Sequence, residues 1–79
     1  MADREVMLGG TRWNVSLLAE RLPRAGAWRL VLGFRPPESR RAQVWAAYPR
    51  EFSSRAALYA KAERLSDQAL ADVLAERLS

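Results

Sequence analysis

The 79 residues leave room for one small domain, which buries only about 60% of its unfolded surface on folding. An apolar fraction of 49% with 28% charged residues is typical of a folded globular chain rather than a disordered one. Because cysteine and histidine are both absent, disulfides, thiol nucleophiles, imidazole acid–base catalysis and the usual zinc sites are excluded.

The net charge of +4 is unevenly distributed along the chain. Residues 1–41 hold eight arginines against four acids, whereas residues 42–79 hold five bases against five acids. Lys61 is the only lysine among 13 basic residues, which a GC-rich genome explains, although arginine also suits phosphate and interface contacts. No apolar run approaches the roughly 20 residues of a membrane helix, and residues 1–5 carry no signal-peptide pattern. We therefore expect a cytoplasmic protein without membrane insertion.

The first 26 residues predict two strands and a turn on either side of the second. Residues 6–8 and 11–15 flank Gly9-Gly10, which favours a two-residue hairpin; a mobile leader over residues 1–10 is the alternative. Residues 16–22 fit either a continued strand with a bulge at Leu17-Leu18 or a short helix that begins at Ser16 and ends at Pro23. The strand is preferred, because residues 23–26 then form a short reversal into the next strand.

The best-patterned segment of the chain is residues 28–34, which predict a central strand. Large apolar side chains alternate there, so that one side faces a core and the other carries Arg29, Val31, Gly33 and Arg35. Residues 36–39 predict a loop that ends at Arg40-Arg41. Alternation over residues 42–48 predicts a fourth strand, which Pro49 is expected to end.

After Pro49 the apolar period changes from 2 to 3.6 residues, which predicts two helices. Ser53 or Ser54 caps a helix to Leu65, and Ser66 caps a second helix with Asp67 in its first turn. The expected fold is α+β: an antiparallel meander sheet of three to four strands, followed by two C-terminal helices packed on one face. The predicted core comprises Trp13, Trp28, Leu30, Leu32, Phe34, Val44, Leu58, Leu65, Leu70 and Leu74, with Val73 and Leu78 also on the apolar face of the last helix.

The sequence offers little for catalysis. No serine has a recognisable base, and Gly9-Gly10 lacks the helix and lysine of a phosphate-binding loop. The acid pairs Glu63/Asp67 and Asp72/Glu76 are four residues apart on the predicted helices, and we expect them to be solvated surface groups with Arg64 and Arg77 nearby. We therefore expect no enzyme activity, catalytic residue, cofactor, metal or small-molecule substrate.

The side of the predicted sheet opposite the helices carries the candidate functional residues. A small non-catalytic interaction module or accessory subunit would bind a partner protein, or itself, through this basic face or through an edge strand. The alternative is single-stranded RNA or DNA, with arginines on phosphates and Trp45 stacked on a base. An ordinary exposed sheet with arginine stems lying over apolar residues has the same pattern. The predicted partner-binding residues are Arg12, Arg29, Val31, Arg35, Arg41, Gln43 and Trp45, with Asn14 beside them.

Overall fold

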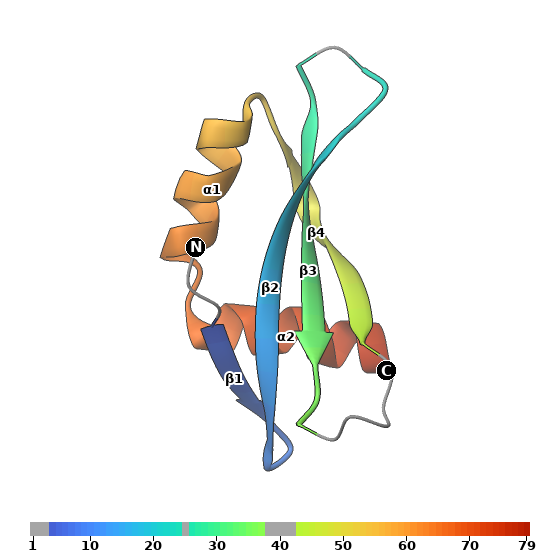
Figure 1. Ribbon diagram of the computed structural model, residues 1–79, viewed down its shortest axis with the longest axis vertical. Helices are drawn as coiled ribbons and strands as arrows, with labels where there is room; N and C mark the ends of the chain where they lie inside the picture. Colours follow the sequence, from blue (N-terminus) through green and yellow to red (C-terminus); the bar gives the residue numbers. More distant parts are fainter. Residues whose placement is uncertain (1–3, 25, 38–42) are drawn as a thin grey trace.

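The computed structural model describes residues 4–24, 26–37 and 43–79, which form one antiparallel sheet followed by two helices (Figure 1). The predicted α+β meander is confirmed, and it has four strands. Neighbours in sequence are neighbours in the sheet, in the order β1-β2-β3-β4. The elements are β1 (Arg4–Leu8), β2 (Thr11–Arg21), β3 (Trp28–Arg35), β4 (Val44–Phe52), α1 (Arg55–Arg64) and α2 (Asp67–Leu78).

The first hairpin follows from its two glycines. Gly9 and Gly10 have φ of 58° and 78°, the positive values that a type I′ turn requires at both central residues. Leu8 pairs with Thr11 across this turn, and β1 lies at one edge of the sheet. Residues 4–8 are thus a short edge strand.

Strand β2 runs without interruption from Thr11 to Arg21, so the prediction of a strand over residues 16–21 is confirmed. The predicted bulge at Leu17-Leu18 is wrong, because the register with β3 is unbroken from Asn14 opposite Arg35 to Arg21 opposite Trp28. No slip is needed, since strict alternation turns Leu17 toward the core and leaves Leu18 exposed on the other side.

Strand β4 continues through Pro49 to Phe52, so the prediction that Pro49 ends the strand is wrong. A sheet edge tolerates proline because no partner strand needs its missing N–H. The register with β3 shifts here, since residues 48–50 lie where β3 has only Leu30. This irregularity adds two residues, which keeps the alternation in phase and brings Phe52 back to the core opposite Trp28.

The two helices begin at the predicted serines. Ser54 Oγ accepts a hydrogen bond from the Ala57 N–H at 3.1 Å, and Ser66 Oγ accepts one from the Ala69 N–H at 3.0 Å. The apolar face of α2 that contacts the sheet ends at Leu74, because Leu78 is 51% exposed, contrary to the prediction. The buried core comprises Val6, Trp13, Val15, Leu30, Leu32, Phe34, Ala46, Phe52, Leu58, Ala62, Leu65, Leu70 and Leu74, with Trp28 and Val44 partly buried against it.

Both helices are fastened to the same face of the sheet, as Figure 1 shows for α2 behind the strands. Arg4 on β1 donates to the Leu65 carbonyl at 2.6 Å and to Asp67 Oδ1 at 2.5 Å, which ties the sheet edge to the junction between the helices. The guanidinium carbon of Arg55 at the start of α1 lies 5.7 Å from the centre of the Trp28 ring, within cation–π range. No helix or strand of residues 4–24, 26–37 and 43–79 covers the opposite face of the sheet.

Leu30 and Leu18 provide a stability test of this one-sided packing. Leu30 is fully buried beneath the helices, so Leu30→Ala should lower the free energy of unfolding by about 2–5 kcal/mol through lost transfer energy and a cavity. Leu18 is 51% exposed on the uncovered side, so Leu18→Ala should change it by less than about 1 kcal/mol. Urea unfolding of dilute protein, followed by circular dichroism, measures both. Equal losses would contradict the arrangement.

Candidate functional site

The candidate site is the side of the sheet that the helices do not cover, here called the outer face. Alternation along each strand places every second residue on it, and cross-strand pairing arranges these residues in rows. From one end of the strands to the other, the rows are Met7–Arg12, Glu5–Asn14–Arg35, Ser16–Gly33–Trp45, Leu18–Val31–Ala47 and Glu20–Arg29–Glu51.

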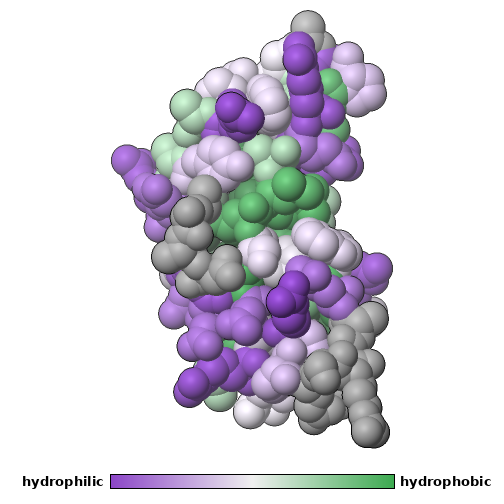
Figure 2. Space-filling view, in the orientation of Figure 1, coloured by the Kyte–Doolittle hydropathy of each residue, from purple (hydrophilic) through white to green (hydrophobic). Residues whose placement is uncertain are grey.

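The third and fourth of these rows form an apolar patch, defined as Leu18, Val31, Trp45 and Ala47. Leu18 and Trp45 are 51% and 48% exposed, two of only four large hydrophobic side chains that are exposed among the described residues. Figure 2, which shows the same side as Figure 1, has a hydrophobic area in the middle, with hydrophilic side chains above and below it. A contiguous apolar area with a polar rim is typical of an interaction site, whereas a single exposed leucine is not.

Trp45 packs on the outer face over Gly33, which lies opposite it on β3 and has no side chain to displace the indole ring. A Cβ atom on Gly33 would lie 2.8 Å from Trp45 Cζ3 and 2.5 Å from Gln43 Nε2, so both side chains lie directly over the Gly33 backbone. Gly33 is buried as a result. Trp45 therefore lies outside the core, packed against β3 on one side and open to solvent on the other.

The two ends of the outer face differ in how their charges are paired. At one end Arg12 and Arg35 are exposed near Glu5, which lies opposite Asn14, and no ion pair among the described residues joins either arginine to an acid. At the mixed-charge end Arg29 Nη1 lies 3.6 Å from Glu20 Oε1, and Arg24 pairs with Glu51, which is also the cross-strand neighbour of Arg29. The positive charge of Arg29 is therefore offset by two flanking carboxylates.

The free edge of β4 is partly blocked. Arg77 Nε on α2 donates to the Trp45 carbonyl at 3.2 Å, so this carbonyl already has a hydrogen-bond partner at the edge where an added strand would pair. Pro49 contributes no N–H to the same strand. Arg77, which the sequence places near the acid pair Asp72/Glu76 on its own helix, reaches across to the sheet edge. Both features disfavour β4 as a docking edge.

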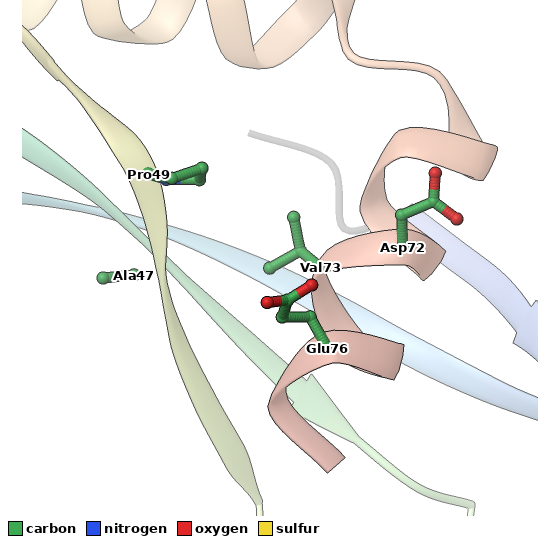
Figure 3. A pocket seen from close by; sticks show the side chains of 5 residues that line it. All are labelled: Ala47, Pro49, Asp72, Val73 and Glu76. Carbon is green, nitrogen blue, oxygen red and sulfur yellow. The ribbon is translucent and has the colours of Figure 1, made fainter. Parts of the chain in front are cut away.

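Two grooves lie on the helix side of the molecule. One of about 330 Å³ separates β4 from α2, and in Figure 3 Val73 points toward β4 while the Asp72 carboxylate points away from it. The other, of about 390 Å³, is lined by Phe52 and residues of α1, and its bases are Arg50, Lys61 and Arg64. Neither brings a nucleophile and a base together, and no group of three carboxylates suited to a metal occurs within residues 4–24, 26–37 and 43–79.

The structure brings most of the predicted site residues onto one surface. Arg29, Val31, Arg35 and Trp45 occupy neighbouring outer-face rows, Gln43 reaches the same surface over Gly33, and Arg12 lies further along β2. Arg41 lies outside the described residues. Sequence reasoning missed Leu18, Glu20 and Glu51: an uninterrupted strand over residues 16–21 would have revealed the first two, and continuation through Pro49 the third.

Comparison of the chain with protein-family models, with curated proteins and with solved structures found no match. Function is therefore inferred from the geometry of the outer face. No helix among the described residues is long and apolar enough to cross a membrane.

The contact between Trp45 and Gly33 gives a double-mutant test. Gly33→Ala should cost about 1–3 kcal/mol of unfolding free energy, because the added methyl displaces the indole ring from the sheet. In a Trp45→Ala background the same change should be neutral or stabilising by up to about 1 kcal/mol, because glycine is unfavourable inside a strand. Urea unfolding of the four proteins measures this coupling. Additive effects would show that the ring does not pack on Gly33.

Proposed function

We propose that this chain is a small non-catalytic interaction module that binds a protein partner through the outer face of its sheet. The observation that carries the proposal is the apolar patch, an exposed tryptophan and leucine with Val31 and Ala47 between charged rims. Desolvated aromatic and aliphatic side chains surrounded by polar groups are the usual composition of a binding hot spot. Because Trp45 is already fixed over Gly33, little side-chain entropy is lost when a partner covers it.

Within this proposal, the outer face is a better docking site than an edge strand. The Trp45 carbonyl is occupied by Arg77, and Pro49 removes a donor from the same edge. Among the described residues, neither helix lies over the outer face, since α1 and α2 pack on the opposite side.

A protein partner also fits the charge distribution better than a nucleic acid does. Single-strand binders place arginines along the path of the phosphates beside the stacking aromatic ring. Here Arg29 is flanked by Glu20 and Glu51, so the described outer-face residues leave two unpaired arginines, Arg12 and Arg35. The groove lined by Arg50, Lys61 and Arg64 lies on the helix side, away from Trp45.

Site-specific photo-crosslinking tests the proposed surface with a matched control. A photo-reactive amino acid at position 18 should form protein adducts in the producing cells, because Leu18 lies in the apolar patch. The same substitution at position 78 should not, although Leu78 is equally exposed at 51% and lies at the end of α2. Adducts from both positions, or from neither, would contradict a specific surface on the outer face.

An oligonucleotide titration tests the nucleic-acid alternative. Tryptophan emission should show no saturable change with a single-stranded oligonucleotide at low salt, where phosphate contacts are strongest. Saturable quenching would overturn the choice of partner if its affinity fell with salt by a slope of about −0.7 per phosphate contact and if Arg35→Ala reduced that slope.

A further inference from the structure

We propose that a second binding site lies in the groove of about 390 Å³ between α1 and the end of β4, and that it takes an acidic segment of a partner protein. The inference does not rest on the proposed function, because no residue of this groove belongs to the outer-face rows. Three cations and three apolar side chains line it. This basic groove is defined as Arg50, Phe52, Ala57, Ala60, Lys61 and Arg64.

One wall of the basic groove is a single stripe of α1. Positions 57, 60, 61 and 64 follow the i, i+3, i+4, i+7 spacing that places side chains on one helix face. The buried stripe of the same helix, which contains Leu58 and Ala62, packs on the sheet beside it. Ala57 and Ala60 are exposed, and their small side chains leave space that longer ones would fill. The groove stripe is therefore open to a ligand.

The other wall is the end of β4, where Phe52 returns to the core after the shift in register with β3. The guanidinium carbon of Arg50 lies 5.8 Å from the centre of the Phe52 ring, within cation–π range. This contact positions Arg50 at the groove without using a carboxylate. Its N–H donors are therefore available to an anion that enters the groove.

The cations of the basic groove come from two elements that converge. Lys61 and Arg64 lie in the last turn of α1, where they offset the negative end of the helix dipole. Arg50 on β4 has no such role. Lys61 is half-buried, as expected when an alkyl stem lies along a wall and the ammonium group reaches solvent. No ion pair within the three described segments of the chain involves any of these cations.

The acids nearest in sequence are directed elsewhere. Glu51 follows Arg50, but it belongs to an outer-face row and pairs with Arg24. Glu63 is two residues from Lys61, which places it roughly 200° around the helix axis, on the other side of α1. Neither acid neutralises the groove, so a bound anion would reduce the repulsion among its cations.

The burial of Phe52 favours a protein segment over a nucleic acid. A single-strand binder needs an open aromatic ring on which a base can stack. Phe52 is only 8% exposed, and its ring already contacts Arg50 and stacks on Tyr48 with centroids 6.3 Å apart. The exposed apolar surface is aliphatic, from Ala57 and Ala60. Carboxylates accept from guanidinium and ammonium groups, so the groove fits a segment in which acidic residues flank an aliphatic one.

Fluorescence anisotropy with a defined peptide tests the site. The probe is a fluorescein-labelled peptide in which one leucine is flanked on each side by two glutamates, titrated with the full chain at about 50 mM salt. It should bind saturably with a dissociation constant on the order of 100 µM. The same peptide with glutamine in place of glutamate should not bind. Absence of saturable binding up to about 1 mM protein overturns the proposal.

A charge-balanced variant tests whether the groove, rather than the net charge, holds the peptide. Lys61→Glu combined with Glu63→Lys keeps the net charge at +4 but moves a cation from the groove to the other side of α1. The double variant should bind the peptide about tenfold more weakly or worse, whereas Glu63→Lys alone should not weaken binding. Circular dichroism confirms that both variants are folded. Equal affinities of the wild type and the double variant overturn the site.

Competition with an unlabelled single-stranded oligonucleotide tests the class of partner. The oligonucleotide should displace the labelled peptide less effectively than the unlabelled peptide does. If it is the better competitor, and if its binding is lost in the charge-balanced variant, the choice of an acidic protein segment is overturned in favour of a nucleic acid.

Discussion

The packing of both helices against one side of the sheet is the constraint on which the rest of the structure depends. A four-stranded antiparallel sheet has two faces, and two helices of ten and twelve residues supply only enough apolar surface to cover one of them. Arg4 and Arg55 fasten the helices to that side. The composition of the outer face then determines whether the second face is inert or adhesive.

The outer face combines features of a solvated sheet and of an interface. Its rims are charged, as in ordinary antiparallel sheets with one wet side. Its centre is not, because Leu18, Val31, Trp45 and Ala47 adjoin one another across three strands. Gly33 is central to this arrangement, since any larger residue there would lift the indole ring off the sheet. A glycine in the middle of β3 weakens that strand. The packing of the Trp45 ring directly on the Gly33 backbone gives a physical reason for a glycine at this position.

The fold was largely predictable from the sequence because its signals are local. Alternation over residues 28–34, paired glycines at the first turn and serines before both helices each indicate one structure without knowledge of the rest. The two wrong strand predictions share a cause. Leu17-Leu18 and Pro49 break local rules, and each is accommodated by its place in the sheet: Leu18 because the outer face is uncovered, and Pro49 because β4 is an edge. Those same errors concealed Glu20 and Glu51, whose effect on Arg29 depends on cross-strand register that no single strand reveals.

The contact between Arg77 and the Trp45 carbonyl has a consequence for how far any assembly of this chain can grow. Continuous growth of a sheet from copy to copy requires that each chain pair with a neighbour along both of its edge strands, here β1 and β4. The contact of Arg77 with β4 disfavours pairing at one of these two edges, which is enough to disfavour continuous growth. A partner bound through the outer face would use that face once, so such an assembly would not extend further. An exposed tryptophan on a small sheet therefore does not by itself imply open-ended growth.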